Sequence, residues 1–273
     1  MTTRQKRVLV FGAHGDDLEF FCGGTIAKFT DRGHEVTLVV ATDNDKGSFE
    51  LTAEELRATR DREIHSAAEV LGIKQVICLG YHDGELQEMA PLPVLRGQLM
   101  KIIREVRPHI VFTFDPFAPY EGHPDHRAVA MAASEAAAFS HLPLYYPEQI
   151  SAGLEPHYVG EHWYFAKVPR DRNKFVDITD YIDKKIEALC KHESQMVLTV
   201  QELQFALAAS NLEISSLADA DPHDYREIID RRERSVAHAV GREPRFEYAE
   251  GFRRTRFGGI ARLAEGQELE EDV

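Results

Sequence analysis

Cysteine is scarce in this sequence, and the three residues of that type, Cys22, Cys78 and Cys190, lie far apart. Their number is odd and they form no CxxC pair, which argues against a disulfide framework and against a zinc site built from thiolates. The chain carries 13 His and 46 Asp and Glu residues instead. We therefore expect any bound metal ion to be held by imidazole nitrogen and carboxylate oxygen.

Positive charge is also in deficit. The 273 residues include 32 Lys and Arg against 46 Asp and Glu, which gives a net charge of −14 with His neutral. This sign argues against a nucleic-acid partner and against an anionic membrane surface, because both are polyanions. Hydrophobic residues make up 43% of the chain and charged residues 29%, a composition that is typical of a globular protein.

Long hydrophobic runs are missing as well. The polar start Met1–Arg7 is followed by a short apolar run, Val8–Ala13, and no later run reaches about 18 apolar residues. These runs are too short for a signal-peptide core or a membrane span, so we expect a cytoplasmic protein with no membrane partner. No repeat or low-complexity linker divides the chain, and we expect one domain over residues 1–273.

The first half of the chain alternates short apolar segments with segments of helical spacing. Strands are expected at Val8–Ala13, Glu35–Thr42, Gln75–Leu79 and His109–Phe114, and helices at Thr25–Arg32, Thr52–Leu71, Leu95–Val106 and Pro124–Ser140. Thr52 and Glu55 have the spacing of a capping box, and Cys22–Thr25 is expected to be a glycine-rich turn. The alternation predicts a Rossmann-like α/β fold, a mostly parallel sheet with helices on both faces.

The second half is expected to cover the active-site cleft. Pro and aromatic residues are frequent over Leu142–Tyr164, which we interpret as an excursion around a substrate cleft. One more strand is expected at His162–Val168, and helices at Thr179–His192, Thr199–Ala209 and Tyr225–Val240. The prediction is a sheet core over about 8–140, a cleft-covering extension over about 141–265, and a disordered acidic tail over 266–273.

The first polar motif, His14-Gly-Asp-Asp17, comes directly after the first expected strand. Ligands of open α/β sheets bind at this carboxyl edge. Because His14 and Asp17 are three residues apart, a turn can aim both at one ion and leave Asp16 to act as a base. Taken alone, the motif fits equally well a polar loop with an Asp that caps the next helix.

The second polar motif, Gly122-His-Pro-Asp-His126, follows the fourth expected strand. Pro124 and Asp125 suit the first turn of a helix, and His123 and His126 can reach one site. Such a pair is more often a surface or capping feature when it occurs alone. Together, the two motifs supply a His/Asp/His set at one sheet edge with a fourth position open, which is the layout of a catalytic zinc site.

These motifs resemble those of the LmbE-like, or PIG-L, family of zinc-dependent N-acetylglucosamine deacetylases. Weaker matches follow in the expected order at Cys22–Thr25, Arg60 with Glu63, Asp83-Gly84, Lys185–Gln195 and Ala249–Arg253. The resemblance implies that His14, Asp17 and His126 bind Zn²⁺, with Fe²⁺ or another divalent ion as an alternative. It covers most of the chain.

The resemblance also implies catalytic roles. Asp16 matches the general base, and His123 matches a protonated partner for the oxyanion or the leaving amine. Asp125 would orient a His, which we take to be His123. The physical reason is that the hydrolysis of an amide needs a group that takes a proton from water and a donor for the tetrahedral oxyanion.

Substrate-binding candidates are Arg60, Asp83 and Tyr120. Tyr120 is a weak match, because the family places its Tyr two residues before the HPDH motif, where this chain has Glu121. The family also has Pro where this chain has Gly15, and we expect this change to affect only the rigidity of the loop.

The implied activity is the hydrolysis of the N-acetyl group of an N-acetylglucosamine-type sugar or conjugate, with release of acetate. The implied partner is a small amino sugar, and the implied assembly is a homo-oligomer, a trimer or hexamer. One alternative is an amidase that cuts a larger amide conjugate. Another is a non-catalytic metal- or sugar-binding protein, which would be expected to lack Asp16 or His123.

A dinucleotide-binding Rossmann protein is a poor match. Its phosphate loop needs the pattern GxGxxG after the first strand. This chain has Gly12-Ala-His-Gly-Asp-Asp17 there, which puts two carboxylates where the pyrophosphate would lie.

Overall fold

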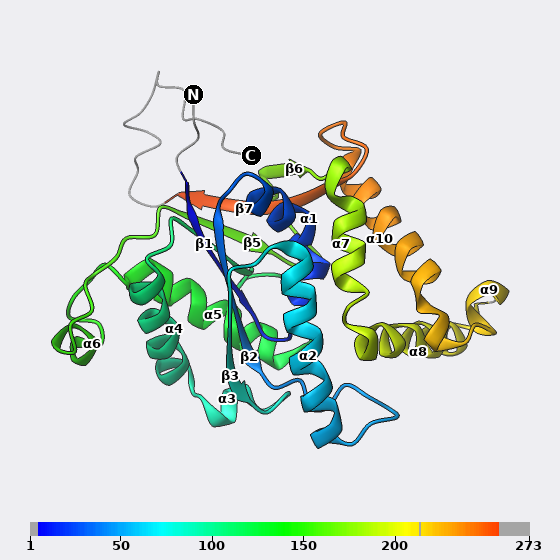
Figure 1. Ribbon diagram of the computed structural model, residues 1–273, viewed down its shortest axis with the longest axis horizontal. Helices are drawn as coiled ribbons and strands as arrows, with labels where there is room; N and C mark the ends of the chain where they lie inside the picture. The colour runs from blue at the N-terminus through cyan, green and yellow to red at the C-terminus, as the bar shows by residue number, and fades with distance from the viewer. Residues whose placement is uncertain (1–4, 213, 257–273) are drawn as a thin grey trace.

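The computed structural model describes residues 5–212 and 214–256, so the expected acidic tail, 266–273, lies outside the described residues (Figure 1). The strands are β1 (Arg7–Gly12), β2 (Glu35–Thr42), β3 (Gln75–Tyr81), β4 (Ile110–Phe114), β5 (Glu161–Phe165), β6 (Lys174–Asp177) and β7 (Ala249–Arg256). The longer helices are α1 (Asp17–Asp31), α2 (Ala53–Leu71), α4 (Leu92–Val106), α5 (Pro124–Phe139), α7 (Ile182–Leu189), α8 (Glu193–Ser210) and α10 (Tyr225–Gly241). Shorter helical segments are α3 (Leu86–Met89), α6 (Pro147–Ser151), α9 (Ser215–Ala218), η1 (Thr179–Tyr181) and η2 (Pro222–Asp224).

The strands form one mostly parallel sheet in the order β3-β2-β1-β4-β5-β7-β6. Strands β1 to β5 run parallel, whereas β7 runs antiparallel to both β5 and β6. The chain builds outward from β1 through β2 and β3 and then crosses to β4 on the other side of β1. In open α/β sheets, this point of reversal is where ligands bind, at the carboxyl ends of the strands.

Helices cover both faces of the sheet, which confirms the predicted fold class. Val8 and Val10 of β1 pack into a core with α1, α2 and α7, while Leu9 and Phe11 pack into a second core with α4 and α5. Figure 1 shows these two helix layers on opposite sides of the sheet. Because both faces of β1 are buried, its sequence is a continuous apolar run.

Most of the expected elements in the first half are confirmed. Helix α2 begins at a capping box of Thr52 and Glu55 and ends at a left-handed Gly72. The expectation of a turn at Cys22–Thr25 is wrong, because these residues lie within α1. A Cβ atom on Gly24 would lie 2.8 Å from the Ile178 side chain, so glycine allows a close approach between the helix and its neighbour.

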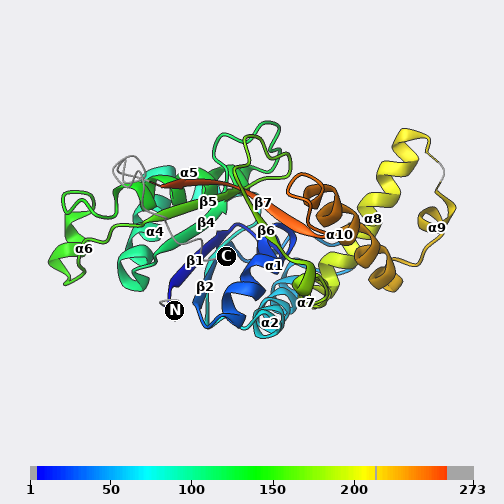
Figure 2. The same ribbon diagram turned by 90° about the horizontal axis from the view of Figure 1, so that it is seen from above.

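The second half differs more from expectation. The segment Leu142–Tyr164 packs beside α4, where the buried Arg104 donates hydrogen bonds to the carbonyls of Leu142 and Tyr145. Strands β6 and β7 were not expected, and the single helix expected over Thr179–His192 is η1 followed by α7. Helices α8, α9 and α10 extend from the sheet on the side away from α6 (Figure 2). Among the described residues, no helix is long and apolar enough to cross a membrane.

Candidate metal centre

The loop after β1 folds back on the carboxylate of Asp17. Its Oδ2 atom accepts hydrogen bonds from the backbone N–H groups of Ala13, at 2.7 Å, and His14, at 2.8 Å. Asp17 is also the first residue of α1, where the helix dipole favours a negative charge. Burial alone would raise the pKa of Asp17, but His126 and His14 hold it well below its usual value. The carboxylate is therefore ionised and fixed in place.

Three potential ligand atoms converge at the ends of β1 and β4. The Nδ1 atom of His14 lies 3.1 Å from Nε2 of His126. The two oxygens of Asp17 lie 3.3 Å from His126 Nε2 and 3.8 Å from His14 Nδ1. Ligand atoms about 2.0–2.1 Å from a tetrahedral zinc ion lie about 3.3 Å apart. The distances from His126 to His14 and to Asp17 are close to this spacing, whereas the 3.8 Å distance from His14 to Asp17 is longer. His14, His123 and His126 also form a group whose ligand atoms could hold a metal ion.

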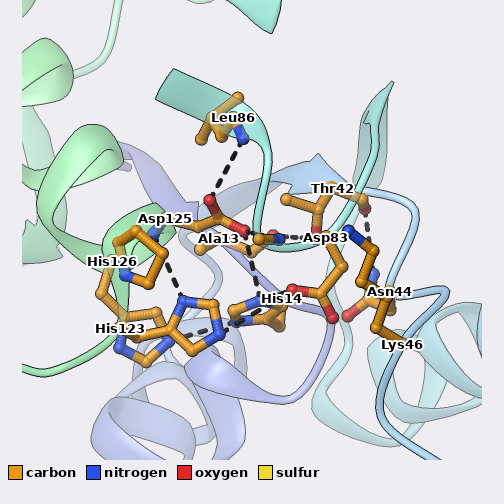
Figure 3. Close-up of polar contacts among 12 residues, drawn as sticks. Ala13, His14, Thr42, Asn44, Lys46, Asp83, Leu86, His123, Asp125 and His126 are labelled. Carbon is orange, nitrogen blue, oxygen red and sulfur yellow. Dashed lines mark hydrogen bonds and ion pairs between the residues drawn. The ribbon is translucent and has the colours of Figure 1, made fainter. Parts of the chain in front are cut away.

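The charge around His14 also favours a cation. Its Nε2 atom lies 3.0 Å from Oδ1 of Asp83, which leaves Nδ1 to face His126 (Figure 3). Burial lowers the pKa of His14, but Asp17 and Asp83 outweigh this effect and raise it to about 10. The side chains of His14, Asp83, His123 and Asp125 also form a group that could hold a metal ion.

Glu121 is a site residue that the sequence analysis missed. Its Oε1 atom lies 3.3 Å from Nδ1 of His126, and Lys167 lies 3.2 Å from the same oxygen. This 3.3 Å distance is within ion-pair range but lacks hydrogen-bond geometry. A carboxylate near one imidazole nitrogen favours a ring orientation that leaves the other nitrogen for a metal ion. The sequence did contain one signal for it, because Glu121 occupies the position where the family has Tyr.

Asp16 lines the same cavity as the potential ligands, and its Oδ1 atom lies 3.0 Å from Nη2 of Arg60. Arg60 is completely buried and also bonds Glu63 and His192 through Nη1. Arg60 does not line the cavity, so the structure places it behind Asp16 and does not support the expected substrate contact. The structure makes it a partner of Asp16 instead.

His123 lies at the start of α5, and its Nδ1 atom accepts a hydrogen bond from the backbone N–H of Asp125 at 3.3 Å. Burial, together with His14 and His126, lowers the pKa of His123 to about 4. In the metal-free protein this pKa favours a neutral imidazole, whereas the sequence predicts a protonated one. Because Nδ1 accepts, we infer that Nε2 carries the proton.

The carboxylate of Asp125 lies near His123 but forms no hydrogen bond or ion pair with it in the described structure, contrary to expectation. It accepts hydrogen bonds from the backbone N–H groups of Gly84, at 2.6 Å, and Leu86, at 3.2 Å (Figure 3). It also lies 3.9 Å from Nε2 of His14. Asp125 thus connects the start of α5 to the loop after β3, which carries Asp83.

The two other expected substrate-binding residues differ in position. Asp83 lies on the cavity wall beside His123. Tyr120 is 85% exposed and does not line the cavity, so the structure does not bring it to the site.

The cavity has a volume of about 990 Å³ and extends well beyond the potential ligands. Phe20, Phe21 and Phe165 form an aromatic part of its wall. Its far side is built by residues of α7, α8, α10 and β7, so the prediction that Leu142–Tyr164 surrounds the cleft is wrong.

Comparison with known proteins gives consistent matches. Residues 9–137 match the model of the PIG-L family, described as GlcNAc-PI de-N-acetylase. The chain is 38% identical to the diacetylchitobiose deacetylase of Thermococcus kodakarensis over 201 residues, which are 72% of this chain and 73% of that protein. It is 32% identical to a probable N-acetyl-alpha-D-glucosaminyl L-malate deacetylase 2 of Bacillus anthracis, covering 73% of this chain and 86% of the relative.

A solved structure is similar over nearly the whole fold. It is the N,N'-diacetylchitobiose deacetylase from Pyrococcus horikoshii, complexed with its inhibitor MPG. The TM-score is 0.75 at 32% sequence identity, and the match covers 92% of this chain and 84% of that one.

Proposed function

The chain belongs to the PIG-L family, and we propose that it is a zinc-dependent N-deacetylase that releases acetate from an N-acetylglucosamine-type sugar or conjugate. One observation carries the proposal. Ligand atoms of His14, Asp17 and His126 converge beside the carboxylate of Asp16 on the wall of a large cavity. The deacetylases named above support the choice of an acetylated amino sugar as substrate.

We propose that His14, Asp17 and His126 hold the metal ion. Two imidazoles and one carboxylate leave room for water and substrate, as in catalytic zinc sites, and the same donors suit Fe²⁺. When bound, the ion would polarise the amide carbonyl and lower the pKa of an attacking water.

Asp16 would be the base of the reaction. Arg60 holds its Oδ1 atom at 3.0 Å, which fixes the direction of the carboxylate. Asp16 would take a proton from the attacking water and then give this proton to the amine as the C–N bond breaks. A positioned base contributes about 10²- to 10⁴-fold to such reactions.

His123 would stabilise the oxyanion as a neutral donor. Its Nδ1 atom is occupied by the Asp125 N–H group, so the inferred Nε2–H group is available to donate to the oxygen of the tetrahedral intermediate. One well-placed donor of this kind is worth about 3 kcal/mol.

The cavity leaves a second candidate function open. Its volume of about 990 Å³ is at the upper end of small-molecule sites, which span about 300–1,000 Å³. There is room for a substituent larger than an acetylated monosaccharide, which favours an amidase acting on a bigger amide conjugate as the alternative.

The single-domain organisation, the cytoplasmic location and the homo-oligomer stay predictions.

The test is acetate release from a panel of N-acetylated mono- and disaccharides and glycoconjugates, measured together with bound metal. We expect the wild type to release acetate and Asp16→Asn to keep the metal but lose at least about 100-fold in kcat. Full activity of Asp16→Asn would exclude Asp16 as the base. A wild type that binds zinc but releases no acetate from any of these compounds would overturn the proposed function.

A further inference from the structure

Gly15 lies between the potential ligand His14 and the proposed base Asp16, in a space that admits no side chain. A Cβ atom on Gly15 would lie 2.2 Å from Cγ1 of Ile64. The backbone N–H of Gly15 donates a hydrogen bond to Oδ1 of Asn44, at 2.8 Å. The loop is therefore hydrogen-bonded to the Asn44 side chain after β2 and packs closely against Ile64 of α2. Thr42 at the end of β2 also donates a side-chain hydrogen bond to the carbonyl of Ala13.

Asn44 is itself held firmly. It is 3% exposed and has a φ angle of 57°, in the left-handed region that few residues other than Gly and Asn adopt. Its Nδ2 group donates to the carbonyl of Thr42 at 2.9 Å. This bond fixes the orientation of the amide, so that Oδ1 is the atom that faces Gly15.

Arg60 connects Asn44 to the proposed base. Its Nη2 group lies 3.0 Å from Oδ1 of Asp16 and 3.4 Å from Oδ1 of Asn44. Asn44 thus contacts both the backbone that precedes Asp16 and the guanidinium that holds its carboxylate. All of these groups are buried or nearly so, which leaves them few alternative partners.

We propose that Asn44 is a positioning residue that keeps the Asp16 carboxylate directed into the cavity, by holding the Gly15 backbone and the Arg60 side chain. This inference rests on the proposed function for the role of Asp16. Asn44 does not contact the cavity, and its effect would pass entirely through the loop and Arg60. A displacement of about 1 Å at a reacting group can cost about 100-fold in rate.

The test is Asn44→Gly, because glycine adopts the left-handed conformation without strain and removes only the side-chain contacts. We expect a cooperative unfolding transition at a lower temperature, because the buried Gly15 N–H loses its acceptor. Below that transition we expect unchanged zinc content and a kcat for acetate release that is about 10- to 100-fold lower, with KM within about twofold. The matched control is Asn211→Gly, since Asn211 has a φ angle of 51° but is exposed at the end of α8. It should leave kcat unchanged.

A second readout does not depend on activity. Hydrogen exchange of the Gly15 amide should accelerate at least about tenfold in Asn44→Gly and stay unchanged in Asn211→Gly. Unchanged exchange of Gly15, or faster exchange with a wild-type kcat, would overturn the inference. If the wild type releases no acetate at all, the proposed function and the role of Asn44 in it both fail, whereas exchange still reports whether Asn44 holds the loop.

Discussion

The two sides of the cavity are built in different ways. The potential metal ligands come from the segments that follow β1 and β4, at the loop and the first turn of each next helix, and these two strands are neighbours in the sheet. On the far side, Lys185 of α7 lies 2.8 Å from Glu250 of β7 and 3.7 Å from Glu233 of α10. The carboxylate of Glu250 also accepts the backbone N–H groups of Gly24 and Thr25 in α1.

The two sides also differ in how their charges are balanced. On the metal side, carboxylates raise the pKa of His14 to about 10, so a positive charge is favoured at a point open to the cavity. On the far side, burial would lower the pKa of Lys185, but Glu250 and Glu233 hold it above its usual value, and the positive charge is already supplied. The first arrangement is suited to accept a cation, and the second joins four elements together. Metal binding and the shape of the cavity should therefore be separable by mutation.

His126→Ala is the variant expected to have the largest effect on the metal side. It removes one of the three converging ligand atoms, and we expect zinc content to fall below about 10% of wild type and acetate release to be lost. Metal analysis after dialysis measures this. The control is His65→Ala, since His65 is exposed on α2. Normal zinc content in His126→Ala would show that this imidazole is not a ligand.

Lys185→Met should lower the unfolding free energy strongly and leave the zinc content almost unchanged, the reverse of the effect expected for His126→Ala. Removing one partner of a buried ion cluster leaves carboxylates without their cation and costs about 3–5 kcal/mol of unfolding free energy. We expect one zinc ion per chain to remain bound below the unfolding transition. Chemical denaturation and metal analysis test both points.

The control for Lys185→Met is Lys74→Met. Lys74 forms an exposed ion pair with Glu35, and such pairs contribute about 0–1 kcal/mol. A loss of zinc in Lys185→Met that matches its loss of stability would show that the two sides of the cavity are not separable.

The difference between the two sides also explains what could be predicted from the sequence. His14–Asp17 and His123–His126 are local motifs, and the apolar strands before them mark where the sheet ends, so their meeting could be predicted. Lys185 and Glu250 are far apart in sequence, and β7 lacks an alternating pattern because three of its residues are Arg. The residues around Asn44 are of the types found in ordinary turns, so the sequence does not mark Asn44 as a positioning residue. Its contact with Gly15 is visible only in the folded structure.

Glu121→Gln tests whether the carboxylate next to His126 supports metal binding. The change keeps the size of the side chain but removes the charge next to Nδ1 of His126. Loss of such an outer partner lowers metal affinity by about 10- to 100-fold, and we expect a zinc dissociation constant higher by that factor. Competition with a chelator measures it. An unchanged dissociation constant would mean that Glu121 does not support the ligand.

The pH dependence of metal binding should reflect His14. In the metal-free protein its pKa is about 10, and a metal ion needs the neutral imidazole. Below that pH, binding must displace a proton, so the apparent zinc affinity should rise about tenfold for each pH unit. Titration calorimetry at pH 7 in two buffers of different ionisation enthalpy should show about one proton released from His14. Asp83→Asn removes a contact that raises this pKa, so it should lower the pH at which the proton release falls to one half. An unchanged pH profile of the release would contradict the assignment.

Tyr120→Phe should have the smallest effect, although Tyr120 is next to Glu121 in sequence. Its side chain is 85% exposed and outside the cavity, so loss of the hydroxyl should change kcat/KM by less than about twofold and stability by less than about 0.5 kcal/mol. Steady-state kinetics on the best substrate of the panel measures this. A tenfold loss would mean that the loop moves when substrate binds and brings Tyr120 to the oxyanion. The metal side would then have a movable part and would not be fully preformed before substrate binds.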